Sequence, residues 1–287
     1  MEIERIGVVG CGLMGSGIAE VCAREGIDVV VVDADDAAVK AGRDRIEGSL
    51  ANAVRRGKLD EADRERALEA VSFSVQLDAL ADRQMVVEAV PESEEIKTAV
   101  FRSLDDIVAD PEAILASNTS SIPIMKLGMA TRRPAQVIGV HFFNPVPVLP
   151  LVELVSSLVT SDDTTARAAR FAEDQLHKHV IRSQDRAGFI VNALLIPYLL
   201  SAIRMLESGF AAAEDIDLGM VQGCAHPMGP LALTDLIGLD TTMAIADALY
   251  EEFKEPLYAP PPLLSRMVEA GLLGRKSGRG FHIYESQ

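Results

Sequence analysis

Short runs of Val, Ile and Leu recur along the first two thirds of the chain, and longer segments with polar residues at helical spacing separate them. Apolar runs bounded by turn residues are typical of buried strands, whereas the mixed segments are typical of surface helices. This pattern predicts strands at 6–9, 27–32, 85–90, 113–117, 137–140, 151–155 and 179–183, and helices at 16–25, 38–56, 61–70, 91–108 and 162–177. The alternation predicts an α/β domain with a mostly parallel sheet and helices on both faces.

A glycine-rich turn follows the first strand. Gly10, Gly12 and Gly15 form the pattern G-x-G-x-x-G between a strand and a helix, and the second strand ends at Asp33. In this context the glycines permit a tight turn, close approach of the backbone to a pyrophosphate, and close packing of helix on strand. Asp33 can accept hydrogen bonds from a ribose diol and would repel a 2′-phosphate, and residues 34–36 include no arginine. A Rossmann-type domain that binds NAD in preference to NADP is predicted; the alternative is a βαβ unit that binds nothing.

The pattern changes after residue 184. The segment 184–188 is predicted to be a linker, beyond which strand signals stop and helices take over. We therefore predict a Rossmann-type NAD-binding domain at 1–184 and an all-α domain at 188–287. The helix predicted at 189–208 is apolar nearly all round, and one domain of about 100 residues could hardly cover it on every side. A homodimer through the C-terminal domain is expected for that reason.

Polar residues follow the ends of several predicted strands. Asp33, residues 88–92, residues 117–121 and His141 all occupy such positions. In an open parallel sheet the carboxyl ends of the strands line the ligand crevice. We therefore expect these residues to border one binding site.

One histidine and one acid indicate the chemistry. His141 follows the strand 137–140, and Glu153 lies among apolar residues in the strand 151–155, with three prolines between the two strands. A carboxylate in an apolar strand is costly to bury unless it has a partner. His141 is the obvious partner, and the pairing would fix the imidazole tautomer of a general base. The alternative is that His141 caps a strand and Glu153 faces solvent.

Composition narrows the class of protein. The chain has 287 residues, of which 48% are hydrophobic and 24% charged, as in ordinary globular domains. A net charge of −16 argues against non-specific binding to nucleic acid or to an anionic membrane surface. No export signal or membrane-spanning segment is predicted, and the three cysteines have neither disulfide nor metal-site spacing. A cytoplasmic enzyme without a metal is expected.

Basic residues are scarce, so their places are informative. Ser49, Arg56 and Lys58 gather at the end of the helix predicted at 38–56. They could bind an anionic ligand, or they could simply be a solvated helix end, where cations suit the helix dipole. Lys178, which lies between two histidines, is expected to be exposed.

Several segments together resemble the 3-hydroxyacyl-CoA dehydrogenase family. They cover nearly the whole chain in order, and the sequence HFFNP followed by LVE is specific to the resemblance. The length and the C-terminal tail are most similar to the stand-alone bacterial 3-hydroxybutyryl-CoA dehydrogenases. The matching segments are 10–15, 118–121, 141–145, 151–153, 188–192, 227–230, 238–240 and 274–281.

The resemblance implies NAD-dependent interconversion of a (S)-3-hydroxyacyl-CoA, with 3-hydroxybutyryl-CoA the first choice, and the 3-oxoacyl-CoA. It implies that His141 is the catalytic base, that Glu153 orients it, and that Ser120 and Asn192 contact the reacting oxygen. CoA contacts are implied for Ser49 and Arg56. The NAD contacts it implies are Gly10, Gly12, Leu13, Met14, Gly15, Asp33, Ala89, Val90, Glu92, Lys97, Asn118, Ser120, Asn144 and Lys276.

Two departures from the family leave alternatives open. Arg56 stands where members often have lysine, which still suits a phosphate, and Pro150 stands where many have a basic residue. The acyl carrier is therefore open, and the alternative substrates are a carrier-protein thioester or a free hydroxy or sugar acid. A protein of another class, which kept the fold and lost turnover, is disfavoured because the four implied catalytic residues are all present.

Overall fold

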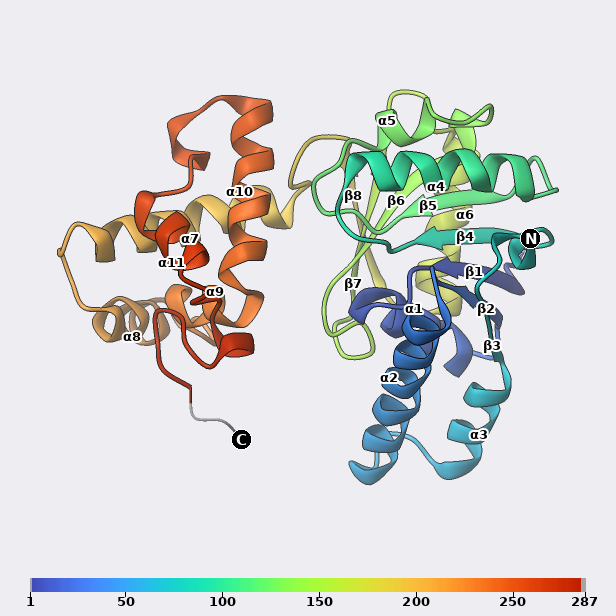
Figure 1. Cartoon of the computed structure of the whole chain (residues 1–287), viewed down its shortest axis with the longest axis horizontal. Coiled ribbons are helices and arrows are strands. Elements are labelled where there is room, and N and C mark those ends of the chain that lie inside the picture. The colour runs from blue at the N-terminus through green and yellow to red at the C-terminus, as the bar shows by residue number, and fades with distance from the viewer. Residues whose placement is uncertain (1, 285–287) are drawn as a thin grey trace. The chain divides into compact units, whose positions relative to one another are not determined.

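The computed structural model describes residues 2–284, which form two compact units that divide between Arg186 and Ala187 (Figure 1). Within residues 2–186 the first unit has one eight-stranded sheet of order β3-β2-β1-β4-β5-β6-β7-β8. Its strands are β1 (Arg5–Val9), β2 (Asp28–Val32), β3 (Val71–Ser74), β4 (Met85–Glu88), β5 (Ile114–Ser117), β6 (Val137–Phe142), β7 (Leu151–Ser156) and β8 (His179–Gln184).

The pairing of these strands is parallel except between β6 and β7. The order of β1 to β6 is that of the dinucleotide-binding fold, in which a crevice opens beyond the carboxyl ends of the strands. The predicted class, a Rossmann-type and mostly parallel sheet, is therefore confirmed. Strand β3 was not predicted, because Val71-Ser-Phe-Ser74 is short, half-polar and only partly buried.

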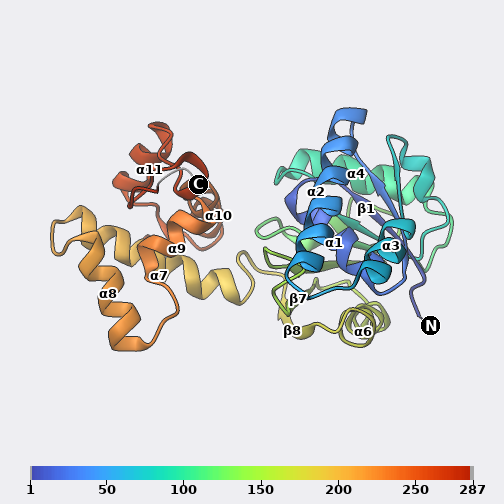
Figure 2. The same cartoon turned by 90° about the horizontal axis from the view of Figure 1, so that it is seen from below.

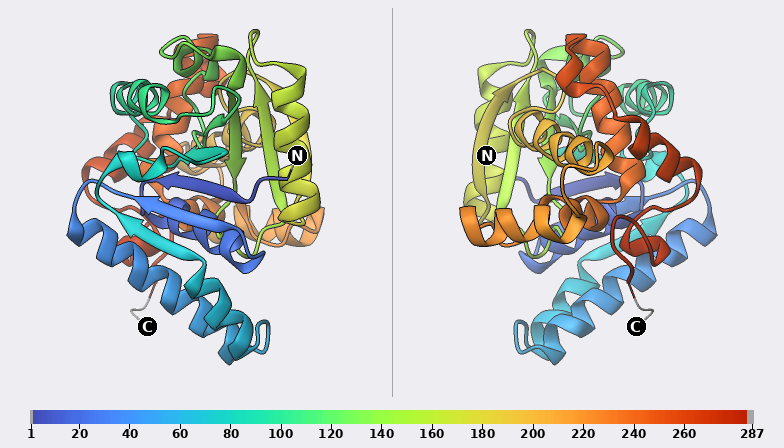
Figure 3. Two further views of the ribbon diagram at one scale, coloured as in Figure 1. Left: turned by 90° about the vertical axis from the view of Figure 1, so that its right-hand side faces the viewer. Right: turned by 90° about the vertical axis from the view of Figure 1, so that its left-hand side faces the viewer.

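Helices cover both faces of this sheet, as predicted. The helices α1 and α3 lie side by side with α2 (Figure 2), and their apolar residues share one core with α6. Figure 3 shows the yellow-green α6 and the teal α4 on opposite sides of the sheet. The helices of this unit are α1 (Leu13–Arg24), α2 (Asp36–Arg55), α3 (Glu61–Glu69), α4 (Glu94–Ile107), α5 (Ile124–Gly128) and α6 (Asp162–Arg170).

The helix predicted at about 162–177 is present as α6 and a short π-helical turn, Phe171–Gln175, that continues it. One prediction near β8 was wrong. Lys178 is buried rather than exposed, because its Nζ donates to the carbonyl oxygens of Val146 at 2.7 Å and Leu149 at 2.8 Å. It thereby fixes the proline-rich loop that joins β6 to β7.

Helices form the second unit, which confirms the predicted all-α domain. They are α7 (Val191–Glu207), α8 (Ala213–Cys224), α9 (Pro230–Ile237), α10 (Leu239–Phe253) and α11 (Pro262–Glu269), packed around one apolar core. The helix α7 buries Ile196, Leu200 and Ile203 in this core but leaves Leu194 73% exposed. No helix in the described part of the chain is both long and apolar enough to cross a membrane.

Two buried acids fix the C-terminal tail onto these helices. Asp235 in α9 accepts from the backbone N–H of Phe281 and of His282, each at 2.9 Å. Asp217 in α8 accepts from the first-turn N–H of Leu231 and from His282 Nε2 at 2.8 Å. The segment before residue 281 carries Lys276, so these acids also place that lysine within the second unit.

Candidate active site

The glycine turn after β1 has the geometry that a dinucleotide requires. Gly10 has φ +97°, and a Cβ there would lie 2.6 Å from the carbonyl oxygen of Ala89. A Cβ on Gly15 would lie 1.8 Å from the carbonyl oxygen of Gly10, which any larger residue would prevent. A Cβ on Gly12 would meet no protein atom, which leaves room for a ligand against the backbone. Gly10 and Gly15 are therefore needed for packing, and Gly12 for access.

Two features beside this turn suit the cofactor. Gly12 caps α1 without a side-chain hydrogen bond, so the amino end of a 12-residue helix faces the turn, as a pyrophosphate site requires. Asp33, directly after β2, accepts from the backbone N–H of Cys11 and, at 2.7 Å, from that of Ala34. The carboxylate is thus held at the strand end and keeps lone pairs for a ribose diol. The residues present fit NAD.

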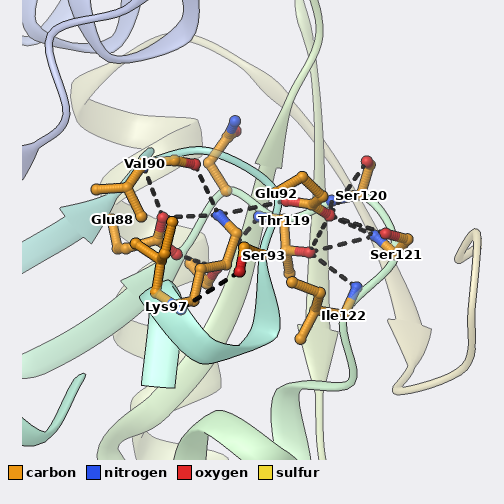
Figure 4. Close-up of polar contacts among 12 residues, drawn as sticks. Glu88, Val90, Glu92, Ser93, Lys97, Thr119, Ser120, Ser121 and Ile122 are labelled. Carbon is orange, nitrogen blue, oxygen red and sulfur yellow. Dashed lines mark hydrogen bonds and ion pairs between the residues drawn. The ribbon is translucent and has the colours of Figure 1, made fainter. Parts of the chain in front are cut away.

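Residues from β4, β5, α4 and the loops that follow β4 and β5 form a second feature, which we call the strand-end cluster (Figure 4). Its members are Glu88, Glu92, Lys97, Ser117 and the turn 119–121. Glu92 accepts from the backbone N–H of Ser120 at 3.0 Å and of Ser121 at 3.1 Å, and from the hydroxyl of Thr119. The charge of nearby Lys97 and these hydrogen bonds hold the pKa of Glu92 below its usual value, although burial alone would raise it. An ionised Glu92 therefore fixes the turn that presents Ser120.

Strand β6 carries the histidine. His141 lies directly opposite Glu153 in the antiparallel ladder of β6 and β7, and its Nδ1 is 2.7 Å from Glu153 Oε2. Glu153 has no exposed surface and His141 is 6% exposed, so solvent competes little for this contact. The ring of Phe143 packs 4.6 Å from the imidazole, centroid to centroid. The expected pairing is confirmed, and the alternative in which Glu153 faces solvent is wrong.

Asn118 joins β5 to β6 at the same edge of the sheet. Its Oδ1 accepts from the backbone N–H of Phe142 at 2.8 Å, and its own backbone N–H donates to the carbonyl oxygen of Glu88. Asn144 follows the β6 strand and is exposed, before the cis peptide bond to Pro145. The carboxyl ends of β1, β2, β4, β5 and β6 thus carry the glycine turn, Asp33, the cluster and the dyad, as the strand-end pattern predicted.

The remaining implied contacts lie farther along the chain. Ser49 and Arg56 stand two turns apart at the end of α2. In the second unit, Asn192 is buried in the first turn of α7. Lys276 binds both oxygens of Asp240, at 2.5 and 2.6 Å.

Comparison with known proteins decides the family. The model of the 3-hydroxyacyl-CoA dehydrogenase NAD-binding domain matches residues 5–186, and that of the family's C-terminal domain matches residues 188–284. The chain belongs to this family. The resemblance stated from its motifs is therefore confirmed.

Close relatives include enzymes with solved structures. A 3-hydroxybutyryl-CoA dehydrogenase of Mycobacterium tuberculosis is 60% identical over 98% of this chain and 99% of its own. The crystal structure of FadB2 from M. tuberculosis has a TM-score of 0.98 at 60% identity, over 99% of this chain and 100% of its own. The (S)-3-hydroxybutyryl-CoA dehydrogenase PaaH1 of Ralstonia eutropha has a TM-score of 0.93 at 46% identity, with 99% and 100% covered.

Sequence reasoning did not assign a role to Glu88, Ser117 or Thr119. Glu88 was visible only as one polar residue at the end of an apolar strand. An acid directly after three apolar strand residues was the available signal, since such an acid is buried only with partners. Its partners could not be named because they come from α4 and β5.

Proposed function

We propose that this protein is an NAD-dependent 3-hydroxyacyl-CoA dehydrogenase that interconverts (S)-3-hydroxybutyryl-CoA and 3-oxobutyryl-CoA. The observation that carries the proposal is the buried contact of 2.7 Å between His141 and Glu153 at the edge of the sheet that also bears the glycine turn. The 60% identical relative of the same length, which bears this activity in its name, supports the choice of substrate.

The geometry assigns the proton to His141. Because Nδ1 faces Glu153, Nε2 is the nitrogen that takes the proton from the 3-hydroxyl group. Glu153 then stabilises the imidazolium, as the acid does in other histidine dyads. Bound NAD would supply the acceptor for the hydride that leaves C3. In reduction, His141 returns the proton to the oxygen.

Ser120 and Asn192 hold the reacting oxygen in this proposal. The hydroxyl of Ser120 belongs to the turn that Glu92 fixes, and the amide of Asn192 is held in the first turn of α7. Preorganised donors of this kind stabilise charge that develops on an oxygen. Ser49 and Arg56 are proposed to bind CoA phosphate groups, and Asn144 and Lys276 to bind NAD.

Initial rates of NADH formation test the substrate. (S)-3-Hydroxybutyryl-CoA should give the highest kcat/KM, compared with the (R) isomer, the same acyl group on a carrier protein, and free 3-hydroxybutyrate. If kcat/KM is higher with the carrier-protein thioester or with the free acid, that compound is the substrate and the proposed one is wrong. The absence of turnover with all of them would reject a dehydrogenase.

NAD rather than NADP is the proposed cofactor. Asp33 is held where it meets a ribose diol, and Ala34, Asp35 and Asp36 provide no positive charge for a 2′-phosphate. The wild-type protein should have a much higher kcat/KM with NAD than with NADP. Asp33→Ala should narrow this difference, because it weakens the binding of NAD more than it improves that of NADP. Equal kcat/KM for the two cofactors in the wild-type protein would refute the proposal.

A second copy of this chain is the proposed partner. The helical unit exposes Leu194, Phe210 and Leu218 by 73%, 78% and 56%, and it carries an apolar pocket of about 350 Å³ beside α7 and α8. Sedimentation at micromolar concentration should give a dimer, and Leu194→Asp should give a monomer. A wild-type monomer would refute it. The cytoplasm is the proposed location, because Cys11 and Cys22 are buried free thiols.

A further inference from the structure

Glu88 is a buried acid to which the proposed reaction assigns no role. It ends β4 with no exposed surface. Its Oε1 accepts from Lys97 Nζ at 2.6 Å and from the backbone N–H of Val90 at 2.7 Å, and its Oε2 accepts from the Ser117 hydroxyl at 2.6 Å. Burial raises the pKa of the Glu88 carboxyl, and the charge of Lys97 with these hydrogen bonds opposes the rise, so the ionised form depends on these partners.

Lys97 is as deeply buried as its partner, with 1% of its surface exposed. Its ammonium donates to Glu88 at 2.6 Å and to the carbonyl oxygen of Val90 at 3.2 Å, and it lies 3.3 Å from Glu92 Oε2. Two of its N–H groups are thus used in hydrogen bonds, and the contact with Glu92 is an ion pair. Because the side chain of Lys97 is 1% exposed and that of Glu92 36%, a ligand would meet Glu92 rather than Lys97 (Figure 4).

The contacts continue to the turn that presents Ser120. The Ser117 hydroxyl accepts from the backbone N–H of Thr119 at 3.2 Å while it donates to Glu88. Glu92 accepts from Thr119, Ser120 and Ser121. Glu88 thus connects to the turn twice, once through Lys97 and Glu92 and once through Ser117.

We propose that Glu88 and Lys97 are positioning residues, which act through Glu92 to hold Ser120 where it meets the substrate oxygen. A buried ammonium needs a compensating charge beside it, and Glu88, 2.6 Å from Lys97 Nζ, provides one. The charge of Lys97 in turn favours ionised Glu92, whose Oε1 accepts the hydrogen bonds from the turn, and an ionised oxygen accepts more strongly than a neutral one. The inference rests on the proposed function in that Ser120 touches the substrate.

The first test separates positioning from direct contact with the cofactor. In Lys97→Met, kcat should fall roughly 10–100-fold, the range that corresponds to the loss of one hydrogen bond to a charged group. The Kd of NADH should stay at the wild-type value. A rise in that Kd as large as the fall in kcat would instead assign Lys97 to the cofactor and overturn the proposal.

The second test is a double-mutant cycle on kcat. Glu88→Gln should lose activity in the wild-type background but little in a Ser120→Ala background, because its target is already absent. Independent roles would make the two losses multiply to within about twofold, and that result would overturn the proposal. Should Glu88→Gln fail to fold, Ser117→Ala removes one of the two connections, keeps every charge, and should show the same non-additivity.

A matched control tests whether any lost charge on α4 has the same effect. Glu94 lies on α4 and pairs with Lys126 at 2.6 Å, but both side chains are 53% exposed. Glu94→Gln should leave kcat unchanged, and an equal loss in this variant would overturn the proposal. If the wild-type protein turns over no hydroxyacyl substrate, the proposed function fails instead, so the two failures are distinguishable.

Discussion

The dyad and the strand-end cluster lie at the same edge of one sheet but are held in different ways. His141 and Glu153 come from two strands whose backbone hydrogen bonds place them opposite each other. Glu92 and Ser120 come from two loops, and their contact depends on a carboxylate and the N–H and hydroxyl groups around it. Register holds the first pair, and charge holds the second.

The difference predicts how each site responds to the loss of a charge. Facing residues in an antiparallel ladder have Cβ atoms about 4.5–5.5 Å apart whatever their side chains are. A neutral side chain at 153 should therefore leave the imidazole in place and impair only the chemistry. A neutral side chain at 92 should release the turn for two reasons. An amide oxygen accepts less strongly than the ionised Oε1 that accepts from Thr119, Ser120 and Ser121, and the amide NH2 group would face the ammonium of Lys97.

The largest effect is expected from His141→Asn. The variant lacks the base, and general-base catalysis is typically worth ~10²–10⁴-fold. Steady-state kcat should fall by that factor, while fluorescence titration gives an unchanged Kd for NADH. A loss below about tenfold would mean that His141 is not the base.

Glu153→Gln should have the next largest effect. The amide can still hold the ring but cannot stabilise imidazolium, so kcat should fall roughly 10–100-fold. KM for both reactants should change little, because the register keeps the ring in place. Wild-type kcat in this variant would make Glu153 a structural residue.

A smaller effect is expected from pH acting on Glu92. Its pKa is below the usual value: burial opposes this, but the charge of Lys97, with hydrogen bonds from Thr119 and Ser121, prevails. The contribution of ionised Glu92 to holding the turn, and so to kcat, is therefore complete above its ordinary pKa. This contribution is lost as pH falls through the lowered pKa.

The variant Lys97→Met should move that loss to higher pH. The measurement is kcat for reduction of 3-oxobutyryl-CoA, a direction in which His141 acts as the acid and stays competent as pH falls. Besides Lys97, the charged group nearest to Glu92 in this network is Glu88. Its negative charge would raise the pKa of Glu92, which is the same direction as the loss of Lys97. If the fall of kcat at low pH occurs at the same pH in Lys97→Met as in the wild-type protein, charge does not hold the turn.

The smallest effect is expected from an exposed ion pair of the same composition. Lys126 and Glu94 are half-exposed, and such pairs contribute about 0–1 kcal/mol. Lys126→Met should change the free energy of unfolding in urea by no more than that, with kcat unaltered. A larger loss of stability would show that this pair, unlike most exposed pairs, has a structural role.

The same comparison explains what could be predicted from sequence. The dyad was predictable because an acid in an apolar strand needs a partner, and His141 stood at the end of the preceding strand. The glycine turn and Asp33 were predictable because the motif occurs with a strand before it and a helix after it. All of these follow from order along the chain.

The strand-end cluster was not predictable in this way. The strand-end pattern placed Glu92 and Ser120 beside the expected site, but Lys97 was named only through a family resemblance, and the link from Glu88 to Lys97 depends on how α4 folds back onto β4. Lys178 was wrongly expected to be exposed for a similar reason. Its partners are backbone carbonyl groups of a distant loop, and carbonyl groups leave no signal in a sequence.

Crystal structures of Glu153→Gln and Glu92→Gln, determined at one pH, test the central claim most directly. The account predicts that residue 153 stays within hydrogen-bonding distance of His141 Nδ1, near the 2.7 Å of the wild-type protein. It predicts that residue 92 and the backbone nitrogen of Ser120, 3.0 Å from the carboxylate in the wild-type protein, separate beyond hydrogen-bonding distance. An intact turn in Glu92→Gln, or a displaced imidazole in Glu153→Gln, would contradict it.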